Sequence, residues 1–281
     1  MKRIVVTGAK GGTGPSIVKT LQQAGYDVLG LDIKPAGPTE TGYVQHDVID
    51  SAGLHDLFAG ADGVVHFGSY PTTAWSSWTA TFHNVAVGGF NVFQTCANLG
   101  IKRIAWASSM EVYGYPLKLP HLPLTEEYPL MPPDIYGGAK VALESLAADY
   151  CRWYDMSIAG FRLGRIVYEG AFDWRLKRHT ESDESAADVL WCYIDALDVA
   201  TACQAWLESD VQGFVPFNVA AEDVCVETPT RELLAKFYPH VTDLRANFDG
   251  HQCPYDSSAL QKAVGWKPQY NWRAIRDESY K

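Results

Sequence analysis

Tyr136 and Lys140 lie four residues apart in the segment DIYGGAKVALE (134–144), a spacing that places both on one face of a helix. Tyrosine has a pKa of about 10, and an ammonium group one turn away favours the phenolate and lowers that pKa. Such a pair suits the removal of a proton from an alcohol. The same spacing also arises by chance, and a packed tyrosine beside a solvated lysine is the alternative interpretation. The elements around the pair decide between the two.

A glycine-rich turn stands near the start of the sequence. In TGAKGGTGPSI, Gly8, Gly11 and Gly14 follow the strand pattern RIVVTG (3–8) and begin a helix pattern (14–24). Glycines at such a junction let the backbone approach a pyrophosphate, and the helix N-terminus offers free N–H groups. A tight turn without a ligand is the alternative, but the position between strand and helix favours a dinucleotide.

Asp32 ends the next strand pattern, DVLGLD (27–32). A carboxylate at that position accepts hydrogen bonds from ribose hydroxyls and repels a 2′-phosphate. The cofactor predicted is therefore NAD. Lys10 and Lys34 are close enough in sequence to keep NADP as the less favoured alternative.

Short β-branched runs alternate with helical patterns along most of the chain. Near-continuous apolar strands separated by helices indicate a parallel sheet covered on both faces, which is a doubly wound α/β architecture, the Rossmann fold. The further strands expected are at about 43–47, 63–67, 103–109, 157–164 and 214–220, and the further helices at about 80–98, 136–154, 196–208 and 228–238.

The regular alternation weakens after residue 164. We expect an NAD-binding Rossmann domain over 1–164, rejoined by about 191–219, and a small substrate-binding lobe formed by 165–190 and 220–281. Segment 172–188 is dense in charge and poor in periodicity, so we expect a loop or lid there.

Composition excludes several classes of protein. The formal net charge is −10 and there is no long basic run, which argues against nucleic acid and against anionic membrane surfaces as partners. The apolar run at the N-terminus is too short for a signal peptide or a membrane span, so we expect a cytoplasmic protein. The six cysteines have no C-x-x-C spacing, which predicts small buried hydrophobes and no metal site.

Taken together, these motifs resemble the extended short-chain dehydrogenase/reductase superfamily, in its NAD-dependent epimerase/dehydratase group. They occur in the family's order and extend over nearly the whole chain. The matching pieces are TGAKGGTG, Asp32, HDV (46–48), VVHFGS (64–69), Asn84, ASSMEVYG (107–114), YGGAK (136–140), FRLGR (161–165) and WCYIDALDVA (191–200).

The resemblance implies a role for individual residues. It makes Tyr136 the base, Lys140 the cation that lowers its pKa, and Ser109 the hydroxyl that holds the substrate oxygen. Cofactor binding is implied for Gly8, Gly11, Gly12, Thr13, Gly14, Asp32, Asp47, Val48, Gly68, Ser69 and Asn84, together with Tyr136 and Lys140. Substrate contacts are expected from Ser69, Ser109, Met110, Arg165 and Arg175. Members of the family usually form homodimers, through the helices expected here at about 80–98 and 136–154.

The resemblance also bears on the substrate. Nucleotide-sugar members carry a long insert after the sixth strand, and the matching interval from Tyr168 to Tyr193 is short here. The compact length is similar to the uronate and aldose dehydrogenases, so a small sugar, sugar acid or related polyol is expected. Met110 departs from that branch, which commonly has an asparagine there.

Basic and aromatic side chains are candidates for the substrate site. Arginines suit a carboxylate or phosphate, although a solvated charged lid is the alternative. Tryptophans suit a sugar ring but also suit packing. The candidates are Arg162, Arg165, Arg175 and Arg178, and Trp75, Trp78 and Trp174.

Three functions are therefore compatible with the sequence. The first is an NAD-dependent dehydrogenase of a small carbohydrate. The second is an epimerase or dehydratase with tightly bound NAD that is recycled in each turnover. The third, least favoured because Ser109, Tyr136 and Lys140 are all present, is a dinucleotide-binding regulator without catalysis.

Overall fold

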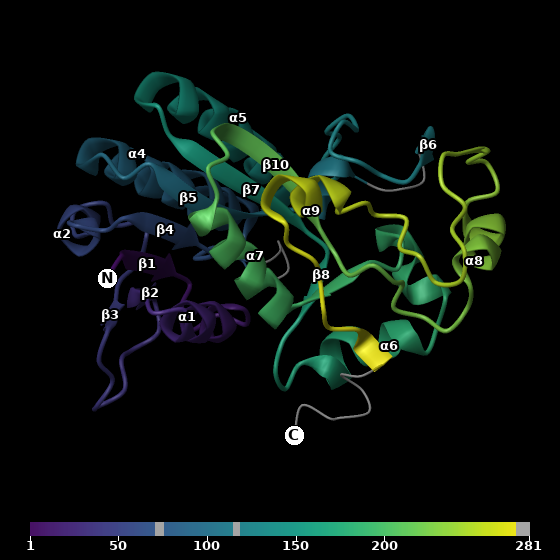
Figure 1. Ribbon diagram of the computed structural model, residues 1–281, viewed down its shortest axis with the longest axis horizontal. Coiled ribbons are helices and arrows are strands. Elements are labelled where there is room, and N and C mark those ends of the chain that lie inside the picture. The colour runs from purple at the N-terminus through teal and green to yellow at the C-terminus, as the bar shows by residue number, and fades with distance from the viewer. Residues whose placement is uncertain (71–75, 115–118, 274–281) are drawn as a thin grey trace.

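A parallel sheet of seven strands forms the centre of the computed structural model, which describes residues 1–70, 76–114 and 119–273. The strand order is β10-β7-β5-β4-β1-β2-β3 (Figure 1). The chain moves outward from β1 in both directions, so a crevice opens at the carboxyl ends of β1 and β4. The predicted doubly wound α/β fold is confirmed. The strand bounds are β1 Arg3–Thr7, β2 Asp27–Asp32, β3 Tyr43–Gln45, β4 Gly63–His66, β5 Arg103–Ser109, β7 Ser157–Leu163 and β10 Gly213–Val219.

Helices cover both faces of this sheet. Alternate residues of a strand point to opposite faces, and in β1 Ile4 and Val6 pack with α1 and α7, whereas Val5 packs with α2, α4 and α5. The helix bounds are α1 Gly14–Gln23, α2 Leu54–Phe58, α3 Trp78–Phe82, α4 Gly88–Leu99, α5 Ile135–Tyr154 and α7 Ala196–Glu208. None of the described helices is long and apolar enough to span a bilayer.

A second lobe lies beside the sheet, with α6, α8 and β6 at the right of Figure 1. Its apolar core includes the fully buried side chains of Trp191, Phe248 and Leu233. Two small parallel sheets join its segments: β8 with β9, and β6 with β11. The bounds are β6 His121–Leu122, β8 Arg165–Val167, α6 Lys177–Thr180, β9 Tyr193–Asp195, α8 Thr230–Phe237, β11 Asp243–Leu244 and α9 Ser258–Val264.

Part of the segment that the sequence assigns to the small lobe packs on the main sheet. Leu260 of α9 and Trp266 belong to the apolar cluster of α1 and α7. The indole N–H of Trp266 donates to the carbonyl oxygen of Asp198, 3.1 Å away.

The helix expected at 80–98 is a composite. α3 continues into a π-helix, His83–Val87 (η2), and then into α4. A π-turn adds one residue to the helical circuit, a local change that period-based pattern reading does not detect. It turns Asn84 inward, where its Oδ1 accepts a hydrogen bond from the N–H of Tyr70 at 2.7 Å.

The charged segment 172–188 is helical rather than a loop, which corrects the expectation from the sequence. A π-helix, Phe172–Leu176 (η5), is followed by α6 and by a 3₁₀ helix, Glu184–Val189 (η6). The first and last of these pieces bury Leu176 and Ala186 against the core of the second lobe. Elements this short show no recognisable helical periodicity in sequence.

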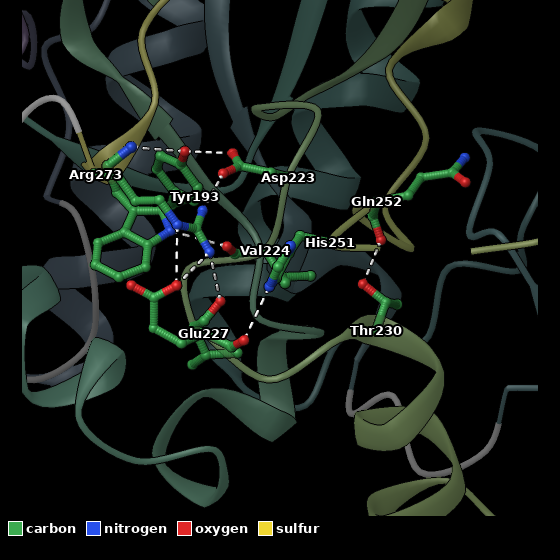
Figure 2. Close-up of polar contacts among 10 residues, drawn as sticks. Tyr193, Asp223, Val224, Glu227, Thr230, His251, Gln252 and Arg273 are labelled. Carbon is green, nitrogen blue, oxygen red and sulfur yellow. Dashed lines mark hydrogen bonds and ion pairs between the residues drawn. The ribbon is translucent and has the colours of Figure 1, made fainter. Parts of the chain in front are cut away.

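The last described residues tie the two lobes together. The carboxylate of Asp198 on α7 accepts hydrogen bonds from the N–H groups of Gln269 (2.8 Å) and Tyr270 (3.0 Å). Beyond them, Arg273 reaches Asp223 and Glu227 of the second lobe, each at 2.9 Å (Figure 2).

Candidate functional site

Tyr136 and Lys140 lie in the first two turns of α5. Asp134 caps this helix, since its Oδ1 accepts a hydrogen bond from the N–H of Gly137 at 2.9 Å. Both side chains are buried: Tyr136 is 8% exposed and Lys140 is 2% exposed. A lysine this deeply buried is unusual unless its ammonium group is paired or functional. The alternative of a solvated lysine is therefore excluded.

The Lys140 ammonium group is held beneath the crevice. It donates to Ser69 Oγ at 3.1 Å and to the carbonyl oxygen of Ala107 at 2.5 Å. Burial lowers the pKa of Lys140 to about 7, although the carboxylate of Glu144 acts in the opposite direction. Near neutral pH this side chain can therefore gain or lose a proton.

The side chain of Ser109 lies beside the Tyr136 hydroxyl and acts to lower the pKa of that group. The Lys140 nitrogen lies 5.4 Å from the centre of the Tyr136 ring. The sequence predicts a lowered pKa for Tyr136, but in the structure the direction is opposite. Burial raises the pKa of Tyr136, because it disfavours the phenolate more than Ser109 and Arg175 favour it.

Glu111 stands beside the same pair and was missed by the sequence reasoning. Its backbone N–H donates to Ser109 Oγ at 3.2 Å. Burial raises the pKa of Glu111, and the charges of Asp134 and Asp188 act in the same direction, whereas Arg165 opposes them. The only signal in the sequence was its place two residues after Ser109.

Arg165 and Arg175 lie near these groups. Burial lowers the pKa of Arg165, and its Nε has no hydrogen-bond partner among the described residues. Arg175 donates from Nε to the carbonyl oxygen of Ile166 at 2.8 Å, and its charge acts on both Arg165 and Tyr136. The charge of Arg175 thus reaches the predicted base, and Arg165 lies near Arg175 and Glu111.

Other candidates for the substrate site are placed differently. Met110 packs against Cys192, with 3.4 Å between the sulfur atoms. Arg178 is exposed and donates to His179, and Trp78 is 79% exposed on α3. Trp75 and the side chain of Trp174 lie outside the described residues.

Arg162 was a candidate for substrate binding, and the structure corrects this prediction because Arg162 is buried in the interior. It is 3% exposed and forms an ion pair with Glu144, with 2.6 Å between Nη2 and Oε2. Burial disfavours its charge, but the hydrogen bonds and charge of Glu144 outweigh burial and raise the pKa of Arg162. The ion pair joins α5 to β7 and so fixes the helix that carries Tyr136 and Lys140.

A hollow opens at the crevice between β1 and β4. Eight predicted cofactor residues line it, and five further lining residues were not predicted. The predicted ones are Gly8, Gly11, Asp32, Asp47, Val48, Gly68, Ser69 and Asn84; the others are Leu31, Ile33, His46, Phe67 and Tyr70. Lys140 connects to the hollow through its hydrogen bond to Ser69.

The glycine-rich turn fits a diphosphate. Gly8 has a φ of +74°, and a Cβ there would lie 2.5 Å from the backbone of Phe67. Within the described residues, Thr13 makes no side-chain cap to the first turn of α1, and Pro15 takes a position that needs no N–H partner. The amides of that turn are therefore placed to bind an anion.

Asp32 is 9% exposed at the edge of the hollow. Its two carboxylate oxygens accept hydrogen bonds from the N–H groups of Lys10 (2.9 Å) and Lys34 (3.2 Å). The Lys10 ammonium group pairs with Glu40 at 2.6 Å, and that of Lys34 donates to the carbonyl oxygen of Lys10. These are the two lysines that left NADP as an alternative cofactor, and both ammonium groups are thus bonded within the protein.

A buried histidine supports the floor of the crevice. Thr7 Oγ1 accepts a hydrogen bond from the N–H of Gly68 (3.2 Å) and is also hydrogen-bonded to His66 Nδ1, 2.7 Å away. Burial, together with the charge of Lys140, lowers the pKa of His66 to about 3. His66 is therefore neutral and structural. Among the described residues no cluster of His, Cys, Asp or Glu has the geometry of a metal site.

Comparison with known proteins agrees with this geometry. The model of the NAD dependent epimerase/dehydratase family matches residues 4–220. The chain belongs to this family. Uronate dehydrogenase of Pseudomonas putida is 32% identical over 168 residues, which cover 58% of this chain and 60% of that protein. UDP-glucose 4-epimerase of Bacillus subtilis is 27% identical over 162 residues, which cover 52% of this chain and 47% of that protein.

Solved structures share the fold of this chain. Uronate dehydrogenase from Agrobacterium tumefaciens superposes with a TM-score of 0.71 at 22% identity, over 99% of this chain and 88% of that one. The chain spans less than two thirds of the length of the Pseudomonas and Bacillus relatives. Fold and family are thus shown, and the two relatives perform different reactions.

Proposed function

We propose that this protein is an NAD-dependent dehydrogenase that oxidises a hydroxyl carbon of a small sugar or related polyol, with a sugar acid favoured. The observation that carries the proposal is the neighbouring pair Ser109–Tyr136, with the charge of Arg175 acting on Tyr136 and that of Arg165 acting on Glu111. A hydroxyl pair suits an alcohol substrate, and two guanidinium groups suit a carboxylate.

Each of these residues has a separate role in the reaction. Ser109 holds the substrate oxygen, and Tyr136 takes the proton of the substrate hydroxyl. When bound, NAD supplies the hydride acceptor and a positive charge that opposes the effect of burial on Tyr136. Lys140 donates hydrogen bonds to Ser69 and Ala107 and lies one helical turn from Tyr136. When protonated, it adds a positive charge near Tyr136.

NAD rather than NADP is the cofactor that the hollow favours. Asp32 places a carboxylate at the end of β2, where it repels a 2′-phosphate. Lys10 and Lys34, the cations nearest in sequence, are bonded to Glu40 and to a backbone carbonyl. No lysine of that loop is then left to bind the phosphate that distinguishes NADP.

A nucleotide-sugar epimerase or dehydratase with tightly bound NAD is the second candidate. The similarity to UDP-glucose 4-epimerase of Bacillus subtilis supports it. The short interval between Tyr168 and Tyr193 opposes it, because little chain is available to hold a nucleotide.

A turnover assay separates these functions. The purified protein is incubated with NAD and D-glucuronate, D-galacturonate, free aldoses or UDP-glucose, and NADH is followed by absorbance. A dehydrogenase accumulates NADH with a free sugar acid or sugar. An epimerase converts UDP-glucose without net NADH, and NAD binding without any turnover indicates a regulator.

The role of Tyr136 is tested by Tyr136→Phe. We expect NAD affinity within a few-fold of the wild type and a fall in turnover of about 10²–10⁴-fold, the usual contribution of a general base. Normal turnover by the Phe variant would show that Tyr136 is not the base. The matched control is Tyr113→Phe, since Tyr113 is buried in the neighbouring structural network.

Two further proposals concern the whole molecule. The helices at 80–98 and 136–154 expose Phe82, Phe90 and Trp153, which favours a homodimer formed through them. A cytoplasmic location is consistent with the absence of disulfides, since all six cysteines are free.

A further inference from the structure

Two different structural reasons explain why glycine stands at these positions of the cofactor turn. A Cβ on Gly14 would lie 2.2 Å from the carbonyl oxygen of Gly8, and one on Gly11 would lie 3.1 Å from the same atom. These glycines are required by the turn itself. Gly12 is different, because its Cβ would lie 2.3 Å from the aromatic ring of Tyr168.

Tyr168 reaches the turn from the second lobe. It follows β8, which pairs with β9 and not with the main sheet. The carbonyl oxygen of Tyr168 accepts a hydrogen bond from the N–H of Ala171 at 2.8 Å, and Gly170 has a φ of +72°. This tight turn fixes the backbone of Tyr168, so its ring lies on the bare backbone of Gly12.

Arg175 supports the ring. Its guanidinium carbon lies 5.5 Å from the centre of the Tyr168 ring, within the range of a cation–π contact. The hydrogen bond from Arg175 Nε to the carbonyl oxygen of Ile166 keeps the guanidinium group next to β8. Arg175 thus contacts Tyr168 while its charge also reaches Tyr136.

We infer that Tyr168 is a positioning residue for the cofactor, covering the pyrophosphate-binding turn from the second lobe so that the dinucleotide leaves only when this contact opens. The inference rests on the proposed binding of NAD at the turn. Gly12 then serves to make room for the ring, and Arg175 holds the ring in place. The rate of cofactor release is thereby set by the second lobe, which also carries the proposed substrate residues Arg165 and Arg175.

The test measures NADH release without any sugar. NADH-loaded protein is mixed with excess NAD in a stopped-flow instrument, and the loss of protein-enhanced NADH fluorescence gives the dissociation rate. We expect Tyr168→Ala to release NADH about tenfold faster with little change in the association rate, as is usual for changes within one interface. Tyr168→Phe keeps the ring and should stay within about twofold of the wild type.

Gly12→Ala provides a second route to the same contact. Its methyl group displaces the ring, so we expect faster release in the single variant and no further acceleration when it is combined with Tyr168→Ala. Thermal unfolding and far-UV circular dichroism identify any variant that does not fold. If Tyr168→Ala did not fold, Gly12→Ala compared with the wild type would decide the question alone.

The possible failures are distinguishable. A wild-type release rate in folded Tyr168→Ala overturns the role of Tyr168, as does equal acceleration by Tyr168→Phe. Failure of the wild type to bind NADH overturns the dinucleotide site itself. Absence of turnover with sugars contradicts only the proposed dehydrogenase, because NADH release is measured without substrate.

Discussion

Breaking the buried ion pair between Glu144 and Arg162 should strongly destabilise the packing of the helix that carries the catalytic candidates. Glu144 lies one turn beyond Lys140 on α5 and is 3% exposed. It accepts hydrogen bonds from Arg162 Nε (3.0 Å), from Arg162 Nη2 (2.6 Å) and from Ser108 Oγ (2.6 Å). The perturbation is Glu144→Gln, which keeps the shape and removes the charge.

The magnitude follows from what the substitution leaves behind. Arg162 would keep its hydrogen bonds to the hydroxyl of Tyr113 (2.7 Å) and to the carbonyl oxygen of Glu126 (3.0 Å) but would lose its counter-charge. Removing one partner of a buried pair costs about 3–5 kcal/mol, because the other charge stays desolvated and uncompensated. That is a large fraction of a typical stability of about 5–15 kcal/mol.

The assay is urea denaturation followed by circular dichroism and tryptophan fluorescence. Asp149→Asn is the matched control, since Asp149 lies on the same helix and pairs with Arg152 at the surface. We expect that exposed pair to contribute less than about 1 kcal/mol. Arg162→Met combined with Glu144→Leu should be more stable than either single variant, because the double change removes both buried charges.

A small effect would refute this reasoning. If Glu144→Gln lost no more stability than Asp149→Asn, the buried pair would not be what holds α5 against β7. Equal losses in the double variant and in the sum of the two single variants would show that the two side chains act independently.

Three further outcomes are expected. The folded-state pKa of Lys140 (about 7) lies below its usual 10.5, so the unfolded chain binds more protons between these values and wild-type stability rises with pH. The stability of Lys140→Met relative to the wild type, measured in urea, should therefore fall by about 1.4 kcal/mol per pH unit above neutral pH, and a pH-independent difference contradicts the shift. Asp32→Ala should weaken NADH binding and relax discrimination against NADPH in fluorescence titrations; an unchanged preference contradicts its role. Phe90→Glu should dissociate a homodimer in light scattering, whereas Leu244→Glu, a residue of similar exposure on β11, should not.

The order of the elements and the cofactor turn were predictable because they depend on local properties of the chain. Strand and helix periodicities placed β1, α1, β2 and α7 within one or two residues of their observed bounds. The π-helix His83–Val87 and the short helices of 172–188 were missed, since neither changes a pattern over enough residues to be detected.

The electrostatic state of the site was not predictable. Spacing brought Tyr136 and Lys140 onto one face of a helix, but burial decides that the pKa of Lys140 falls and that of Tyr136 rises. Burial is set by η2, β5 and β7, which pack against α5 in the folded chain.

The sequence by itself determined the fold class, the dinucleotide turn and the Tyr136–Lys140 spacing, because glycine conformations and helical geometry act over a few residues. Only the tertiary structure decided where the charged groups lie relative to Tyr136. It paired Arg162 with Glu144 in the interior, placed Arg175 where its charge acts on Tyr136, and laid Tyr168 on Gly12. Contacts between residues so far apart in the chain depend on packing, which no local pattern specifies.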